Sequence, residues 1–241
     1  MKILVLCGGK GARFGEAAKG CQKVLLGMDG IPYSRPTILD VKMRLLAEAD
    51  IPIEGNTYLL AGFGADGFGD SPYKISAEPE PLGTGGALLY AARMYPEILE
   101  DNEGVIITNG DTPIMIDFPA IYRMMVEKNA SVIVVDRGKE GNITKTRTGK
   151  VANFSEERHY PYANAGLTLL RPQDFALVVD LYSDGNGIRR ENNDSLYRRL
   201  ASIGSLYAYI IGDREFRLGI NNPKELEYAR RNLRFRASLN H

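Results

Sequence analysis

The sequence predicts an α/β protein with a Rossmann-like, three-layer α/β/α fold around a mixed, mostly parallel central sheet. Two observations favour this fold class. The apolar runs at 2–6 and 104–111 are rich in β-branched residues and lack the period-2 alternation of a half-exposed strand, as expected of parallel strands that helices cover on both faces. Amphipathic stretches separate such runs, which is typical of a doubly wound sheet. The length of 241 residues suits one large domain, and we predict a single domain over 1–241.

The N-terminal half predicts three strands and three helices. After the first strand, 37–49 places Ile38, Val41 and Leu45 on one face of a helix. Two further stretches have similar helical spacing, and SVIVVD resembles the first two strands in composition. The predicted elements are a strand at 2–6, helices at 37–49 and 83–95, a strand at 104–111, a helix at 118–128 and a strand at 131–136.

The C-terminal half has a different character. Polar and apolar residues alternate on both sides of a Gly-Lys pair in 143–157, which indicates a hairpin. The segment 163–175 predicts a strand, a Pro and then a helix, and 206–212 predicts one more buried strand. A closing helix at 222–236 has Pro223 in its first turn. We therefore expect a small β-rich flap around 140–165.

Composition limits the partners. The 30 Lys and Arg residues balance the 30 Asp and Glu residues, whereas binding to nucleic acid or to a membrane surface needs a basic excess. We predict a small-molecule partner, and neither nucleic acid nor a membrane. Cys7 and Cys21 form neither a metal-ligand pair nor a disulfide framework, which indicates a reducing compartment. No stretch approaches the roughly 18 apolar residues of a membrane span, so we expect a cytoplasmic protein.

A glycine-rich turn, CGGKGARFG (7–15), follows the first strand. It lies at the carboxyl end of a buried parallel strand, where open α/β sheets bind ligands. Gly8, Gly9 and Gly11 would let backbone N–H groups approach a polyphosphate, and Arg13 offers a charged fork to the same oxygens. The turn matches neither a Walker A loop nor a GxGxxG fingerprint. A tight turn that binds no ligand is the alternative interpretation.

Lys23 favours the phosphate-binding interpretation. It follows Arg13 by ten residues and precedes Val-Leu and a glycine turn that contains Pro32. This order of residues resembles the N-terminal signature of the sugar-1-phosphate nucleotidylyltransferases, with Gln22 where the family usually has Pro.

Later segments extend the resemblance over nearly the whole chain. AEPEPLGTGGAL (77–88) is similar to the family's base- and sugar-contacting loop, NGDTPI (109–114) to its strand-end metal motif, and NAGLTLL (164–170) to its sugar-contacting segment. EFRLGINNPKEL (215–226) resembles the C-terminal metal segment of the N-acetylglucosamine-1-phosphate uridylyltransferases. The resemblance implies that 1–241 is a nucleotidyltransferase domain and that the protein is an enzyme.

The implied reaction joins a nucleoside triphosphate and a sugar 1-phosphate into an NDP-sugar and pyrophosphate. The attacking phosphate monoester has a second pKa of about 6 and is largely ionised at pH 7, so no general base is needed. The protein must supply alignment and positive charge. The resemblance implies that Gly8, Gly9, Gly11 and Arg13 hold the triphosphate, while Lys23 lies near the reacting phosphates.

The resemblance also implies a Mg²⁺ cofactor. Asp111, which follows a buried strand and a glycine, would hold the ion, and Asn221 would be the second protein ligand. A strand-end aspartate that caps a turn is the alternative for Asp111, and a turn residue is the alternative for Asn221. In the other register of the C-terminal segment, Arg217 would take the carboxylate position, where it could not bind the ion.

Sugar recognition is implied for the second half. Glu156 would accept hydrogen bonds from sugar hydroxyls, and Asn164 would bridge sugar or ribose groups. Arg158, at a position where the family usually has Lys, would hold the sugar phosphate. Gly83 and Gly141 would keep space for base and sugar. For Glu156, an exposed carboxylate in a hairpin-rich region is the alternative.

The residue type at position 78, a glutamate, indicates which nucleotide base the protein binds. It lies five residues before Gly83, where thymidylyl- and uridylyltransferases of the family typically place Gln. A carboxylate only accepts hydrogen bonds, and guanine offers two adjacent donors, so Glu78 favours GTP over UTP. The uridylyl-like C-terminal segment conflicts with this prediction. A solvent-facing Glu78, with a backbone group reading the base, is the alternative.

Other functions stay open on sequence alone. The chain could use UTP or CTP, act on a non-sugar phosphate such as phosphocholine, or be a molybdopterin-type nucleotidylyltransferase. From a different class, it could be a non-catalytic subunit that binds a sugar nucleotide. A homo-oligomer is compatible with the sequence, which identifies neither the sugar nor the oligomeric state.

Overall fold

A nine-stranded sheet organises the computed structural model, which describes residues 1–9, 13–15, 21–62, 65–69, 71–155, 157 and 159–239. Among the predicted site residues, Gly11, Glu156 and Arg158 lie outside the described residues. The main path of the sheet consists, in spatial order, of β12 (Leu206–Ile210), β6 (Ser131–Gly141), β9 (Tyr160–Leu170), β4 (Val105–Asn109), β1 (Lys2–Leu6), β2 (Thr57–Ala61) and β3 (Lys74–Ala77).

The sheet is mixed but mostly parallel, as predicted. Only β9 in this path runs against its neighbours: it pairs antiparallel with both β4 and β6, while the other four pairings are parallel. Leu6 is in register with Leu60 on one side and Asn109 on the other. The carboxyl ends of β1, β2 and β4 therefore meet at one edge of the sheet.

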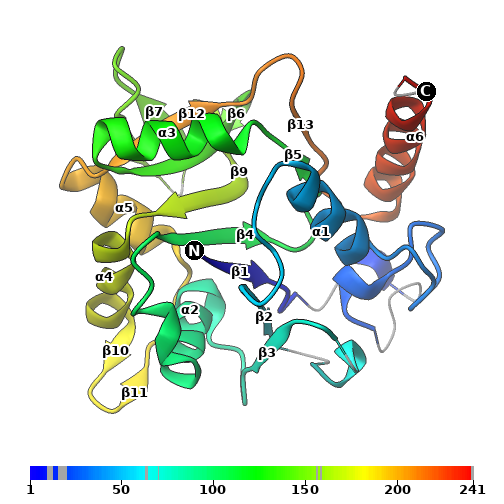
Figure 1. The fold of residues 1–241 in the computed structure, drawn as a ribbon, viewed down its shortest axis with the longest axis horizontal. Coiled ribbons are helices and arrows are strands. Elements are labelled where there is room, and N and C mark those ends of the chain that lie inside the picture. The colour runs from blue at the N-terminus through cyan, green and yellow to red at the C-terminus, as the bar shows by residue number, and fades with distance from the viewer. Residues whose placement is uncertain are drawn as a thin grey trace.

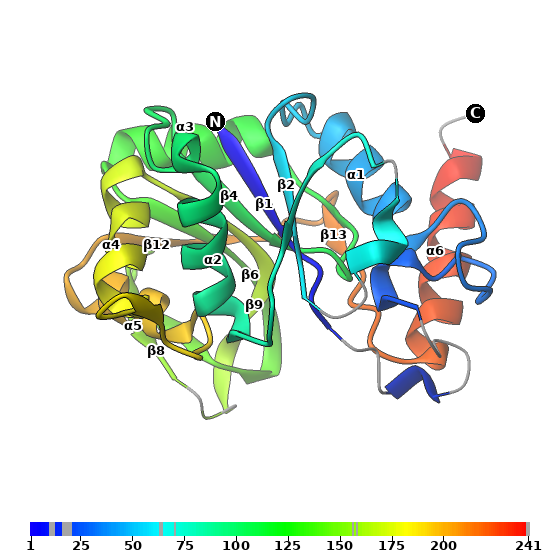
Figure 2. The ribbon, with the colours of Figure 1, turned by 90° about the horizontal axis from the view of Figure 1, so that it is seen from below.

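Helices cover both faces, which completes the three predicted layers (Figures 1 and 2). α2 (Gly83–Met94), α4 (Pro172–Tyr182) and α5 (Asp194–Ser202) bury apolar side chains against one face, and α1 (Ile38–Glu48) and α3 (Phe118–Lys128) against the other. α6 (Pro223–Leu239) lies at the end of the molecule opposite α4 and α5. Its Leu226 and Ala229 pack against Ile38 and Val41 of α1 in a third cluster.

Short elements complete the fold. The predicted flap is built by the hairpin of β7 (Ile143–Lys145) and β8 (Val151–Phe154), which joins the sheet through β9. The remaining elements are β5 (Ile114–Met115) paired with β13 (Phe216–Arg217), β10 (Ser183–Asp184) paired with β11 (Gly187–Ile188), and the 3₁₀ turns η2 (Lys23–Leu25), η3 (Ala65–Phe68) and η4 (Pro96–Ile98).

Local chemistry explains where the first helix begins. The side chain of Thr37 accepts from the backbone N–H of Asp40, whose carboxylate accepts in turn from the Thr37 N–H, so the two residues form a capping box. The predicted apolar stripe of α1 is buried as expected. None of the helices within the described ranges is long and apolar enough to cross a membrane.

Candidate active site

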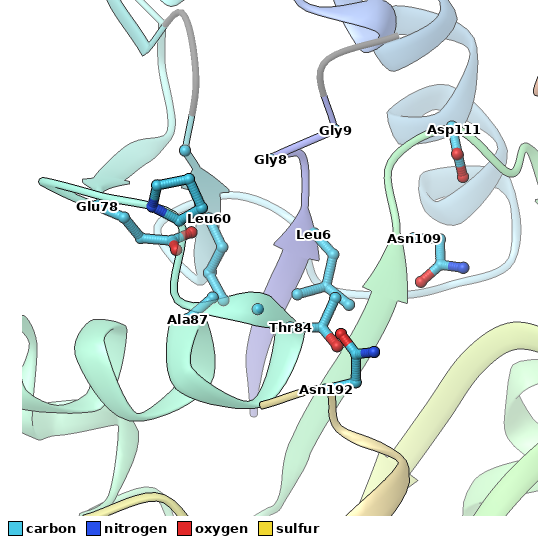
Figure 3. Close-up of a pocket in the computed structure, with 13 residues that line it drawn as sticks. Leu6, Gly8, Gly9, Leu60, Glu78, Thr84, Ala87, Asn109, Asp111 and Asn192 are labelled. Carbon is cyan, nitrogen blue, oxygen red and sulfur yellow. The ribbon is translucent and has the colours of Figure 1, made fainter. Parts of the chain in front are cut away.

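A cavity of about 420 Å³ opens at the carboxyl ends of β1, β2 and β4 (Figure 3). Leu6, Leu60 and Ala87 give it an apolar floor. Figure 3 shows Glu78 on one side of this floor and Asn109 and Asp111 on the other. An apolar surface with a few polar groups around it is typical of a site for a small organic ligand.

Two glycines of the glycine-rich turn, Gly8 and Gly9, line this cavity. A Cβ atom on Gly8 would lie 3.3 Å from the backbone nitrogen of Gly62, so two strand ends approach closely there. Around Gly9, a Cβ atom would meet no heavy atom within 4 Å. Arg13 is exposed, and the structure does not place it among the residues that line the cavity.

Three of the predicted residues converge beside the cavity. The buried Val24 and Leu25 anchor η2, and the Nζ atom of Lys23 forms an ion pair with Oδ2 of Asp111. The same Nζ donates to Oδ1 of Asn221 at 3.5 Å. Residues from three distant parts of the chain thus surround a single point.

Backbone hydrogen bonds fix the segment of Asn221 beside the turn of Asp111. The N–H of Ile220 donates to the carbonyl of Asp111 at 3.0 Å, and the N–H of Leu218 donates to that of Pro113 at 2.8 Å. Asn221 donates its own N–H to Glu225 in the first turn of α6. Arg217, the residue of the other register, pairs with Asp136 at 3.1 Å. Asn221 is instead the residue that shares the Lys23 ammonium with Asp111.

The chemistry of these side chains fits a magnesium ion. A carboxylate oxygen and an amide oxygen face the same cationic group, and Mg²⁺ prefers such hard oxygen ligands. The described residues contain no group of three or more His, Cys, Asp or Glu side chains that could hold a metal. The remaining ligands of an ion here would therefore be phosphate oxygens and water, as is usual for Mg²⁺ with nucleotides.

Glu78 forms the opposite wall. Its Oε2 accepts from the backbone N–H of Leu82 at 3.0 Å, and its Oε1 lies beside Gly8 and Gly62. Burial raises the pKa of Glu78, and the bond from Leu82 acts in the other direction. Each carboxylate oxygen accepts more than one hydrogen bond, so Glu78 can still receive donors from a ligand.

The remaining predicted residues have structural roles of their own. A Cβ atom on Gly83 would lie 2.6 Å from the carbonyl oxygen of Glu191, and one on Gly141 would collide with the backbone of Tyr162. Both glycines are thus required by neighbouring backbone, whether or not a ligand is bound. Asn164 accepts from the N–H of Gly166 at 2.9 Å and shapes the β9 strand beside Asn109.

Sequence reasoning missed several residues of the site. Thr84, Asn109 and Asn192 line the cavity, and Thr84 exchanges hydrogen bonds with Asn193 at the start of α5. Asn109 was within reach of the sequence argument, since it belongs to the strand-end segment that contains Asp111. Nothing in the sequence around Asn192 marks it.

Lys42, which does not line the cavity, was also missed by the sequence analysis. It is fully buried, and its Nζ donates to the carbonyl of Thr112 at 2.9 Å. Burial lowers the pKa of Lys42 to about 7, against the opposing effect of the Asp111 carboxylate. Burial also raises the pKa of the neighbouring Cys7 thiol well above its ordinary value, so this thiol is neutral. A signal was available, because Lys42 lies four residues from both Ile38 and Leu46, on the apolar face of the helix.

Comparison with known proteins yields relatives of one kind. No protein-family model matches the chain. A D-glycero-α-D-manno-heptose 1-phosphate guanylyltransferase of Aneurinibacillus thermoaerophilus is 22% identical over 169 residues, which cover 68% of this chain and 71% of the relative. The protein of the same name from Campylobacter jejuni is 26% identical over 186 residues, which cover 73% of this chain and 80% of the relative.

Solved structures share the fold. A Bacillus anthracis protein assigned as a glucose-1-phosphate thymidylyltransferase, in complex with sucrose, superposes with a TM-score of 0.73 and 16% identity, covering 95% of this chain and 94% of its own. HddC from Yersinia pseudotuberculosis, complexed with GMP-PN, superposes with a TM-score of 0.68 and 19% identity, covering 96% of this chain and 99% of its own.

The chain has the Rossmann-like α/β fold of these solved structures, and its cavity lies at the carboxyl ends of the parallel strands. More particularly, the chain is related to the sugar-1-phosphate nucleotidylyltransferases. The resemblance drawn from its motifs is therefore confirmed, and so is the prediction of an enzyme of this class.

Proposed function

We propose that this protein transfers a guanylyl group from GTP to a sugar 1-phosphate in a Mg²⁺-dependent reaction that releases pyrophosphate. One observation carries the proposal: Lys23, Asp111 and Asn221 converge beside the cavity whose other wall is Glu78. A cationic group and hard oxygen ligands at one end of a nucleotide-sized cavity suit the phosphates, and a carboxylate at the other end suits a base.

The step that this site must support is an in-line displacement. An oxygen of the sugar 1-phosphate forms a bond to the α-phosphorus of the triphosphate, and the bond from that phosphorus to the bridging oxygen of pyrophosphate breaks. The nucleophile is already ionised near pH 7. The protein therefore needs no base, and its task is to align two anionic reactants and to offset their charge.

Different side chains would align the reactants and offset their charge. Lys23 lies within reach of both Asp111 and Asn221, so its ammonium would contact phosphate oxygens bound beside these residues. Asp111 and Asn221 would hold the magnesium ion, which supplies positive charge to the phosphates when bound. The backbone at Gly8 and Gly9 lines the route between this end and the base wall.

Two lines of support favour guanine. An ionised Glu78 can pair with the two adjacent donors of guanine while it keeps its bond to Leu82, and it would repel the carbonyl oxygens of uracil. Independently, both sequence relatives reported above are named as guanylyltransferases. Their names also make D-glycero-α-D-manno-heptose 1-phosphate the first sugar phosphate to test.

The test is a pyrophosphate-release assay with the full chain. GTP, ATP, CTP, UTP and dTTP are each combined with the 1-phosphates of this heptose, mannose, glucose and N-acetylglucosamine, with and without Mg²⁺. We expect release that requires Mg²⁺ and is fastest with GTP and one of the sugars. Equal or faster release with UTP or dTTP would contradict the base assignment alone. No release with any pair, together with tight binding of an NDP-sugar, would favour a non-catalytic subunit.

A further inference from the structure

Two lysines flank the turn that carries Asp111, and the reaction outlined above uses only one of them. Lys23 meets the Asp111 carboxylate beside the cavity. Lys42 donates to the carbonyl of the next residue, Thr112, at 2.9 Å. Asp111 lines the cavity, whereas Lys42 is fully buried and does not. The second lysine therefore approaches the turn from inside the protein.

A lysine in this position is unfavourable for stability. Lysines are almost never fully buried unless they are paired, and the one hydrogen bond described for Lys42 satisfies only one of its three donors. Its neighbours along α1 are the apolar Val41 and Met43, both buried. An apolar side chain of similar length, such as methionine, would fill this space without a charge, which suggests that the charge itself has a use.

The charges around Asp111 suggest what that use is. Within the described part of the chain, Lys23 and the protonated form of Lys42 contribute two positive charges, the carboxylates of Asp111 and Glu225 contribute two negative charges, and Asn221 and the Cys7 thiol are neutral. The charges around the metal ligands therefore cancel while Lys42 is protonated, and they would be negative in total without it. Lys42 thus removes the net attraction of these surroundings for a free divalent cation, whereas a bound triphosphate adds negative charge that restores it.

We propose that Lys42 is a positioning residue that acts through Asp111 to exclude free divalent cations, so that the metal enters the site only together with the nucleotide. The inference rests on the metal site of the proposed function. It assigns to Lys42 a role in the order of binding, and it requires no contact between Lys42 and any substrate.

The experiment measures Mn²⁺ binding directly, by electron paramagnetic resonance and calorimetry, to the full chain at pH 6.5 without nucleotide. Lys42→Met removes both the charge and the bond to Thr112, and Lys42→Gln removes the charge but keeps a donor. Arg44→Met is the control, since Arg44 is an exposed cation on the same helix. We expect both Lys42 variants to bind Mn²⁺ at least about tenfold more tightly than the wild type and the control. Adding Asp111→Asn to Lys42→Gln should abolish that gain.

Several results would overturn the inference. One is an unchanged Mn²⁺ affinity in Lys42→Gln, even if Lys42→Met differs, because the bond and not the charge would then matter. Another is a gain that survives Asp111→Asn, because the ion would then bind elsewhere. Circular dichroism confirms that each variant is folded, and Lys42→Gln keeps the test valid if Lys42→Met does not fold. Pyrophosphate release by the wild type is measured separately, so failure of the proposed function remains distinguishable.

Discussion

The two walls of the cavity are built in different ways. The wall of Lys23, Asp111 and Asn221 consists of charged and amide side chains that meet across 88 and 198 residues of sequence. The wall of Glu78 consists of one carboxylate held against backbone, since Glu78 accepts from the N–H of Leu82 and lies beside Gly8 and Gly62. The difference suggests that the first wall determines whether the reaction occurs and the second determines which nucleotide is used.

Among changes to the first wall, we expect Asp111→Asn to have the largest effect on activity. Losing the carboxylate removes the one charged ligand proposed for the metal and the partner of Lys23, so we expect turnover to fall a hundredfold or more, about 3 kcal/mol of barrier or above. Pyrophosphate release measures this, and a thermal melt shows whether the fold is kept. Activity close to that of the wild type would mean that the metal assignment is wrong.

Lys42, which is buried behind the same wall, can be tested through the pH dependence of stability. Below its folded pKa of about 7, the ammonium is protonated in both the folded and the unfolded chain. Between about 7 and the ordinary value of 10.5, only the unfolded chain holds the proton, so stability rises with pH. Relative to Lys42→Met, the wild type should gain about 2 kcal/mol of unfolding free energy from pH 7 to 9. Urea titrations at several pH values measure the difference, and parallel curves for the two proteins would contradict it.

The second wall is tested by Glu78→Gln, which exchanges a pure acceptor for an amide that also donates. We expect the ratio of kcat/KM for GTP to that for UTP to fall about tenfold or more, with the folded structure unchanged. Because burial raises the pKa of Glu78, the GTP preference of the wild type should also decline as pH is lowered towards that pKa. Glu80→Gln is the matched control, since Glu80 is an exposed carboxylate paired with Arg190. If both variants kept the wild-type ratio, Glu78 would not read the base.

The smallest effect concerns Gln22, beside Lys23. Its amide is buried, and neither polar atom has a hydrogen-bond partner among the described residues. Its φ of −63° suits proline, the residue that the related family usually has there. We expect Gln22→Pro to raise the unfolding free energy by about 1 kcal/mol, because it removes unsatisfied polar atoms and restricts the unfolded chain. Chemical denaturation measures this. A loss of stability would indicate that the amide has a partner in the native protein.

The sequence predicted most of the fold because its strongest signals are local. The runs that became β1 and β4 are continuous and apolar, and α1 has a capping box and a clear stripe. β3 was not predicted, since Lys and Ser occupy half of its four positions. α5 was also missed, although Leu196 and Leu200 lie one turn apart, because most of the other residues of that helix are charged or small and polar.

The place of a candidate site residue could be predicted where the residue follows a strand end, and it could not where distant backbone decides the geometry. Asp111 follows β4, so its place at the edge of the sheet could be anticipated. The reason for Gly141 could not, because it depends on the backbone of Tyr162 in another strand. Lys42 was overlooked because a lysine within an apolar stripe is normally solvated, and only the tertiary fold brings Thr112 to it.

The bonds that join Leu218 and Ile220 to the Asp111 turn also bear on how the protein is made. Contacts between residues far apart in sequence form only after a large loop has closed, and a chain leaves the ribosome from its N-terminus. The strands β1, β2 and β4 can pair once the chain has emerged as far as Asn109, but Asn221 reaches Lys23 only after the chain up to Asn221 has also been made. A nascent chain can therefore acquire much of its sheet well before it acquires the complete site.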